Sequence, residues 1–117
     1  DVVRQLEIAD RAIRERDFEA LATISEASCL RMHANAMAAN PGIMYWKTVT
    51  VELIHRVRRM RQDGLGAFFT IDAGPHVKVF CQAQDADAVG ALLKEVPGVL
   101  KVLVPKPGPG AYVVPET

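Results

Sequence analysis

The chain has 117 residues, of which half are apolar and about a quarter are charged, an ordinary mixture for one globular domain with a single core. Its 14 Lys and Arg residues balance its 14 Asp and Glu residues, so no net charge draws it to nucleic acid or to an anionic membrane. No apolar run approaches the roughly 20 residues that cross a bilayer.

The first third of the chain predicts two helices. Apolar residues recur at helical spacing from Val2 to Ile13, with charged residues between them, which predicts a surface helix with one buried stripe. A second helix should begin near Asp17, which can cap it, and run through Ala36 until Asn40-Pro41-Gly42 ends it. We expect this helix to be covered on most sides and to form an antiparallel pair with the first.

An aromatic segment and a third helix follow. Met44-Tyr45-Trp46 is interpreted as an apolar plug for one end of the core, with a contact to substrate or to a partner subunit as the alternative. The third helix should be capped near Thr48 and end at Gly64. Its arginines, from Arg56 to Arg61, could indicate a phosphate or nucleic-acid site. They lie in the last turns, where the backbone presents carbonyls, so a solvated face is the preferred interpretation.

The segment from Phe69 to Phe80 predicts a hairpin. β-branched and aromatic residues flank Gly74-Pro75, which forces the chain to turn. Asp72 then lies at the lip of the sheet, where an unpaired buried carboxylate would be costly. It is either a turn residue that accepts backbone N–H groups or a residue with a chemical role.

The rest of the chain predicts one more helix and one or two strands. Asp85 should cap a helix that Pro97-Gly98 ends, and residues 99–104 read as a strand. A proline-rich loop then leads to a possible edge strand at residues 111–114. The order indicates an α+β fold, an antiparallel sheet with helices on one face, in which α-β-β-α-β is most of a ferredoxin-like unit.

Three stretches resemble one family in the same order. Thr70–Pro75 resembles the T-x-D-A-G-P-N signature of diphosphomevalonate decarboxylases, which belong to the GHMP kinase superfamily. Residues 32–46 resemble that family's H-A-T/M helix and the P-P-x-x-Y segment after it, and Pro107–Gly110 resembles its P-G-P-Q turn. The sequence departs from the pattern at His76, where the family has Asn, and at Gly42, where it has Pro.

The resemblance implies an α/β sandwich of the GHMP-kinase C-terminal type. Residues 1–117 would be a single domain, the C-terminal domain of a larger enzyme whose N-terminal ATP-binding domain is absent here. A start without Met, inside an amphipathic pattern, and the lack of a Gly-rich phosphate loop agree with that expectation. The family further implies a homodimer, and Cys29 and Cys81 are expected to be reduced thiols in a cytoplasmic protein.

The activity that the resemblance implies is the decarboxylation of mevalonate 5-diphosphate to isopentenyl diphosphate with ATP and Mg²⁺. Asp72 would be the catalytic residue, Ala73 and Gly74 would let the backbone approach the substrate, and His33 would help to shape the cleft. From its position alone, His33 reads as a core or rim histidine. No histidine of the sequence has a metal-ligand pattern, so no metal site is expected.

Two other functions stay open from the sequence. A GHMP-family kinase would phosphorylate a mevalonate-like hydroxy acid phosphate without decarboxylating it. A non-catalytic α+β dimerisation module would use Asp72 only as a turn cap. The sequence also leaves open whether the substrate carries one phosphate or two.

Overall fold

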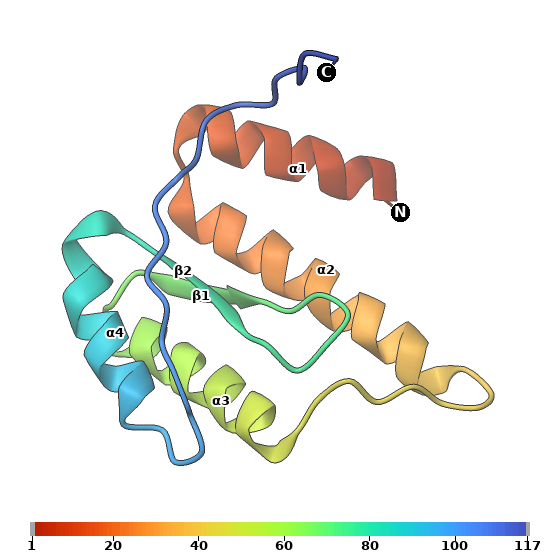
Figure 1. The fold of residues 1–117 in the computed structure, drawn as a ribbon, viewed down its shortest axis with the longest axis vertical. Helices are drawn as coiled ribbons and strands as arrows, with labels where there is room; N and C mark the ends of the chain where they lie inside the picture. Colours follow the sequence, from red (N-terminus) through yellow and green to blue (C-terminus); the bar gives the residue numbers. More distant parts are fainter. Residues whose placement is uncertain (1, 117) are drawn as a thin grey trace.

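A computed structural model describes residues 2–116, which form four helices, one short 3₁₀ turn and one antiparallel hairpin (Figure 1). The α+β class predicted from the sequence is confirmed. Among the described residues, no helix is both long and apolar enough to cross a membrane. The elements in chain order are α1 (Val2–Glu15), α2 (Phe18–Ala38), α3 (Thr48–Gln62), β1 (Ala67–Thr70), β2 (Lys78–Cys81), the turn Ala83–Asp85 and α4 (Ala86–Lys94).

The hairpin forms because its two strands offer apolar residues on both faces of a pleated ribbon. Phe68 of β1 lies opposite Phe80 of β2, and their rings stack with centroids 5.2 Å apart. Phe18 at the start of α2 packs on the same Phe68 ring at 5.4 Å. Phe69 points to the other face of the sheet and is fully buried.

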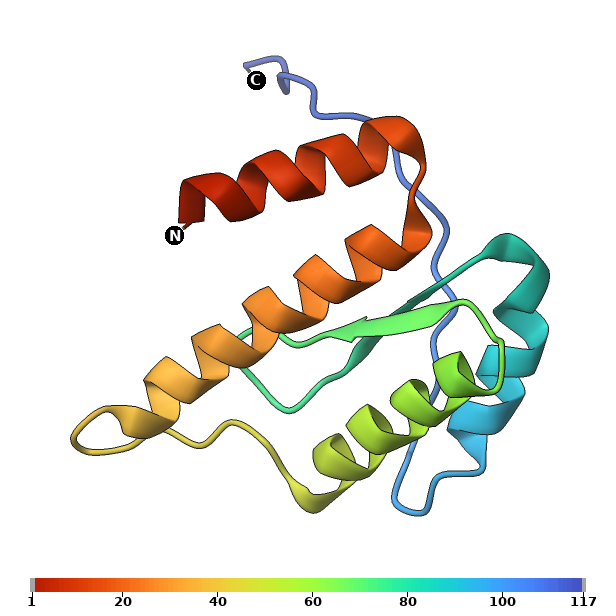
Figure 2. The same ribbon diagram turned by 180° about the vertical axis from the view of Figure 1, so that it is seen from behind.

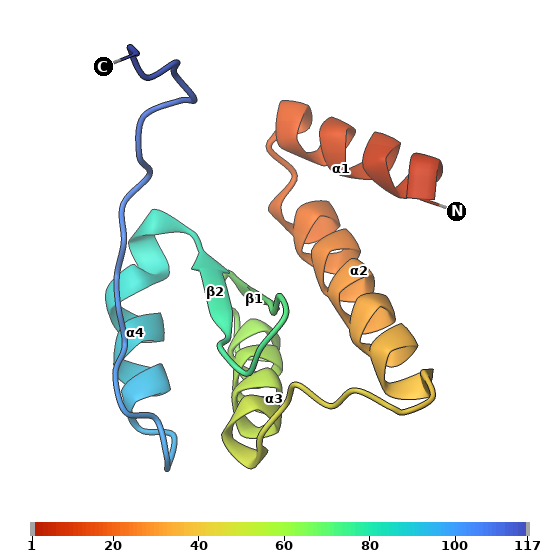
Figure 3. The ribbon, with the colours of Figure 1, turned by 45° about the vertical axis from the view of Figure 1, so that its right-hand side comes forward.

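The core lies on that second face, between β1 and the helices α2, α3 and α4. Figures 1 and 3 show the hairpin between α2 on one side and α4 on the other, with α3 beside it. The expected arrangement of a sheet with helices packed on one face agrees with this core. Its buried members are Cys29, Ile54, Val57, Met60, Ala67, Phe69, Ile71, Val89 and Leu93.

The helix boundaries follow local signals, though not always those expected. Asp17 caps α2, because its Oδ1 accepts the Ala20 N–H at 3.0 Å, as predicted. Gly64, with φ +94°, follows the C-cap residue Asp63 and ends α3, also as predicted. The other two helix starts also lie where they were predicted, because Lys47, next to Thr48, is the N-cap of α3 and Asp85 is the N-cap of α4. The Asp85 side chain does not cap α4, however, and its carboxylate instead accepts the Gly66 N–H at 2.8 Å.

The predicted burial of α1 and α2 needs correction. Helix α1 runs back beside α2, on the side away from the hairpin (Figure 2), so the expected stripe on α1 is mostly exposed, with Val2, Leu6 and Ile13 at 62–70%. Helix α2 is buried along one stripe and not on most sides. That stripe includes a carboxylate, Glu26, and a histidine, His33.

The two strands predicted after α4 are not formed within residues 2–116. The chain runs extended past α4 (Figure 3), and Val102 packs against the core. Residues 111–114 are likewise outside the sheet, which has two strands in the described part of the chain. β-branched residues make a strand only where a neighbouring strand pairs with them, and here the backbone meets none.

Candidate active site

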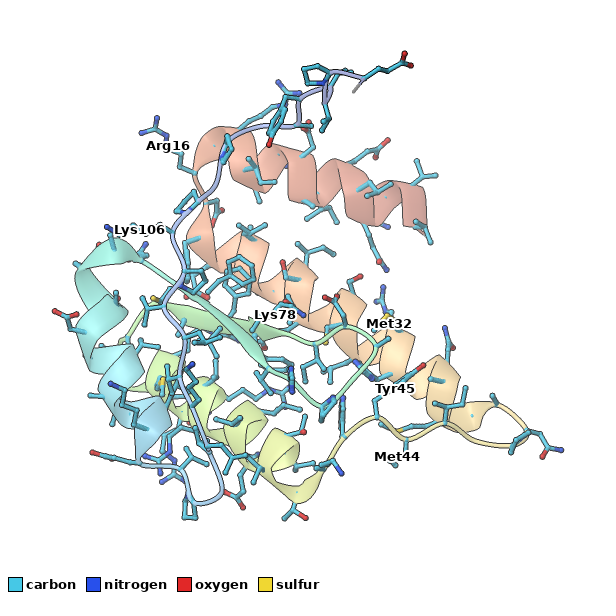
Figure 4. All side chains as sticks on the ribbon, in the orientation of Figure 1. Arg16, Met32, Met44, Tyr45, Lys78 and Lys106 are labelled. Carbon is cyan, nitrogen blue, oxygen red and sulfur yellow. The ribbon has the colours of Figure 1, made fainter. Side chains whose placement is uncertain are left out.

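Asp72 lies two residues beyond the end of β1, in the loop that joins the strands of the hairpin. Its side chain is 79% exposed, so it is not the buried acid that the sequence allowed for. Lys78 at the start of β2, labelled in Figure 4, donates from Nζ to Asp72 Oδ2 at 2.6 Å across the hairpin. The carboxylate therefore accepts a hydrogen bond from a lysine, rather than capping the turn, and it remains open to solvent.

The peptide just before Asp72 is held by two side chains of α2. Cys29 accepts the Ile71 N–H at 3.2 Å and also donates to the Ile71 carbonyl oxygen at 3.5 Å. His33 Nε2 donates to the same carbonyl at 2.9 Å, and because a carbonyl only accepts, Nε2 carries the proton. Ile71 is 1% exposed, so these contacts satisfy polar groups that have no strand partner. We call Cys29, His33 and the Ile71 peptide the backbone clamp.

The other side of the loop is fixed by α3. Thr50, which is almost fully buried, donates its hydroxyl to the Pro75 carbonyl oxygen at 2.9 Å and accepts the Lys47 N–H at 3.1 Å. The loop is thus held at Ile71 by α2 and at Pro75 by α3. Asp72, Ala73 and Gly74 lie between these two fixed points. Rigid support on both sides is what a catalytic carboxylate needs, because small displacements from the reactive geometry are costly.

Asp72 also borders a groove of about 370 Å³ between α1, α2 and the end of β1. Val2 and Leu6 of α1 contribute apolar surface, and Ser25 and Ser28 of α2 contribute hydroxyl groups. Met32, labelled in Figure 4, lines the same groove. The groove joins an apolar wall to a carboxylate, which suits a small ligand with both apolar and polar parts.

A second polar cluster, which sequence reasoning missed, supports β1 from behind. The Glu26 carboxylate is 6% exposed and binds Arg61 through two hydrogen bonds, at 2.7 and 3.2 Å. It also lies 3.8 Å from Arg58 Nε and accepts the Phe69 N–H at 3.4 Å. The sequence pattern does indicate that Glu26 is buried, because it falls on the same helical stripe as Cys29 and His33.

This cluster corrects the interpretation of the basic run as a solvated face for Arg61, whereas Arg58 and Arg59 are exposed as expected. Arg61 is only 24% exposed, and Arg58 places its guanidinium 5.8 Å from the centre of the Phe69 ring. Arg56 lies 3.8 Å from Glu95. Three of the arginines therefore face carboxylates of this chain, which opposes a role for them in binding an external anion.

The thiol of the backbone clamp is chemically quiet. Burial raises the pKa of Cys29 above its ordinary value, so the group is a neutral thiol at pH 7 and can donate as well as accept. The pKa of Cys81 is also raised by burial. Both cysteines are free, and the described residues contain no group of three side chains suited to hold a metal ion.

Of the predicted site residues, Ala73 and Gly74 lie beside Asp72 in the loop, whereas His33 lies in the buried core. Ala73 is exposed beside Asp72, and a side chain at Gly74 would meet open space, so the backbone there is accessible. His33 is 1% exposed and packs against the rings of Tyr45 and Trp46, at 5.9 and 5.0 Å between centroids. Within this chain, His33 supports the loop through its hydrogen bond to the Ile71 carbonyl oxygen. Direct contact with a substrate stays a prediction.

Replacing His33 tests the backbone clamp. We expect His33→Leu to lower the free energy of unfolding by about 1–3 kcal/mol, because a buried carbonyl loses its strongest partner. His55→Leu is the matched control, since His55 is an exposed histidine on α3 and its loss should change stability by less than about 0.5 kcal/mol. Denaturant unfolding of both variants gives the comparison. Equal stabilities would show that the His33 contact is energetically neutral.

The chain matches one known protein family over most of its length. The model of the family "Mevalonate 5-diphosphate decarboxylase C-terminal domain" matches residues 2–102. The human diphosphomevalonate decarboxylase is 33% identical over 79 residues, covering 66% of this chain and 20% of the human protein. The phosphomevalonate decarboxylase of Haloferax volcanii is 27% identical over 79 residues, covering 67% and 24%. The chain thus spans about a quarter or less of the curated relatives it matches.

Solved structures give the same fold. The mevalonate diphosphate decarboxylase from Enterococcus faecalis superposes on this chain with a TM-score of 0.77 at 36% sequence identity. That structure concerns the mechanism by which mevalonate diphosphate mediates ATP binding in the Enterococcus enzyme. The match covers 80% of this chain and 29% of that one. A structure described as MDDEF in complex with MVAPP, AMPPCP and magnesium has a TM-score of 0.78 at 34% identity, covering 83% and 30%.

Proposed function

Because this chain belongs to the family of mevalonate 5-diphosphate decarboxylase C-terminal domains, we propose that it is the C-terminal domain of an ATP-dependent decarboxylase. The enzyme converts mevalonate 5-diphosphate to isopentenyl diphosphate, a step of isoprenoid biosynthesis. This domain supplies Asp72 and one wall of the substrate cleft. The observation that carries the proposal is an exposed carboxylate on a loop that α2 and α3 hold on both sides.

Asp72 acts on the hydroxyl group of the substrate. A tertiary hydroxyl is a poor nucleophile, so a carboxylate within hydrogen-bond reach must orient it or accept its proton as the new O–P bond forms. ATP supplies the phosphoryl group that turns this hydroxyl into a leaving group. The Asp72 carboxylate is solvent-open in this chain, as a group facing a cleft between two domains should be.

Three further residues shape the site in this proposal. Ala73 and Gly74 leave the backbone next to Asp72 uncovered, so the substrate can approach it closely. His33 completes the site either by contact with substrate or, as its hydrogen bond to Ile71 favours, by fixing the strand end. When carbon dioxide leaves, the electron-poor carbon must be shielded from water, and the apolar side of the groove would form one wall of that shield once the rest of the enzyme covers it.

We assign ATP and Mg²⁺ mainly to protein outside this sequence. The described residues hold no cluster of three metal ligands, and the sequence holds no Gly-rich phosphate loop, so this chain by itself does not fit a magnesium nucleotide. The related structure with AMPPCP and magnesium supports the assignment at the level of the family. The domain alone is therefore proposed to be inactive, and the complete enzyme to be a cytoplasmic homodimer.

The alternative within the same family is a change of substrate. The similarity to a phosphomevalonate decarboxylase favours testing mevalonate 5-phosphate beside the diphosphate. A kinase that phosphorylates without decarboxylating is the other alternative, and for it the phosphorylated hydroxy acid would accumulate.

Product identification by mass spectrometry tests the proposal. The complete protein is incubated with ATP and Mg²⁺ and with either mevalonate 5-diphosphate or mevalonate 5-phosphate. We expect isopentenyl diphosphate from the first substrate and little turnover of the second. Preferred turnover of the monophosphate would contradict the diphosphate assignment, and a stable phosphorylated acid would indicate the kinase.

A further inference from the structure

Lys78 forms an ion pair with Asp72, and the proposed chemistry so far assigns this lysine no role. It stands at the start of β2 directly opposite Thr70, and it reaches past Thr70 to the Asp72 carboxylate. Its side chain is 52% exposed, so the ammonium group is also open to a ligand. An exposed ion pair of this kind is weak and rearranges easily.

The chemistry of a 3-hydroxy acid creates a conflict beside Asp72. The carboxylate of such an acid is separated from the hydroxyl-bearing carbon by a single methylene group. A base that reaches the hydroxyl oxygen therefore also lies close to the carboxylate of the substrate. Two carboxylates at such a distance repel each other unless a cation lies beside them.

We propose that Lys78 binds the carboxylate of the 3-hydroxy acid substrate while it remains paired with Asp72. This inference rests on the proposed function and names a substrate-binding residue for it. An ammonium group has three N–H donors, so one can stay on Asp72 and the others can reach the substrate. Lys78 thereby selects an acid over a neutral alcohol that carries the same hydroxyl and diphosphate groups.

The other cations near the loop do not meet this need. Arg61 and Arg58 face Glu26 behind the strand, on the core side of β1. His33 is buried and donates to Ile71, and His76 in the loop is an exposed imidazole, not a permanently charged ammonium group. Among the described residues around this loop, Lys78 is therefore the cation that we assign to a second carboxylate beside Asp72.

The test separates recognition of the carboxylate from other effects of the charge. Binding of mevalonate 5-diphosphate to the complete protein is measured by calorimetry, beside 3-hydroxy-3-methylbutyl diphosphate, which lacks the carboxylate. We expect Lys78→Met to weaken binding of the acid about tenfold and to leave binding of the analogue within about twofold. Lys78→Arg, which keeps the charge, should restore most of the affinity for the acid.

Steady-state kinetics give a second readout. Because the pairing exists already in the bound substrate, Lys78→Met should raise KM about tenfold and change kcat much less. Lys94→Met on α4 is the matched control, an exposed lysine away from the loop, and it should change neither.

Either of two results would overturn the proposal. Equal weakening of the acid and the analogue would mean that Lys78 does not recognise the carboxylate, and no weakening of either would leave it as an ordinary surface ion pair. A wild-type protein that binds the acid but releases no carbon dioxide would contradict the proposed function instead. The ratio of the two affinities would still decide the role of Lys78.

Discussion

Asp72→Asn is expected to lower kcat of the complete enzyme by about 10²–10⁴-fold, the usual contribution of a general base or an orienting carboxylate. The amide keeps the size of the side chain but cannot take the proton of the substrate hydroxyl. Because Asp72 is exposed and its partner Lys78 is half exposed, stability should change by less than about 1 kcal/mol. Steady-state kinetics and thermal unfolding of the same preparation measure both effects.

The matched control for that substitution is Asp87→Asn, an exposed carboxylate in the first turn of α4. It should leave kcat unchanged. If Asp72→Asn retained activity within a few-fold of the wild type, Asp72 would be a loop residue without a chemical role. Loss of the fold together with activity would instead indicate a structural carboxylate, which its exposure opposes.

Glu26→Gln should strongly destabilise the fold. Its carboxylate is buried and joins α2 to Arg61 of α3 and to the backbone of Phe69. Removing the charge leaves Arg61 without an anionic partner, and breaking a buried pair costs about 3–5 kcal/mol when the remaining charge stays buried. Arg61 is 24% exposed and can partly reach water, so we expect a loss of about 2–4 kcal/mol by denaturant unfolding.

A double-mutant cycle with Arg61→Gln isolates this pair. The sum of the stability losses in the two single variants should exceed the stability loss in the double variant by more than about 1 kcal/mol, because the two side chains interact directly. Glu19→Gln, an exposed position on the same helix, is the control and should lie within about 0.5 kcal/mol of the wild type. Additive losses would mean that Glu26 and Arg61 contribute independently.

Local patterns were enough to predict the four helices and the hairpin. Helix caps and turns are set by a few neighbouring residues, so they can be predicted without the tertiary structure, as they were at Asp17, Gly64 and Gly74-Pro75. The strand predicted at residues 99–104 failed for the opposite reason. Strand formation depends on a neighbour, and β propensity cannot show whether that neighbour is present.

The site was harder to predict than the fold. The motif around Asp72 pointed to the loop, but the partners of that loop come from distant positions: Cys29 and His33 on α2, and Thr50 on α3. Their spacing in sequence carries no sign that they meet. His33 was singled out from the resemblance alone, and its hydrogen bond to Ile71 could be found only in three dimensions.

The central claim is that this domain supplies the carboxylate for a phosphorylation that ends in decarboxylation. The most direct measurement follows ADP and carbon dioxide together in one time course, with the complete wild-type protein and Asp72→Asn side by side. We predict equal amounts of the two products from mevalonate 5-diphosphate, and a loss of both in the variant. ADP without carbon dioxide, or equal activity in the variant, would contradict the account.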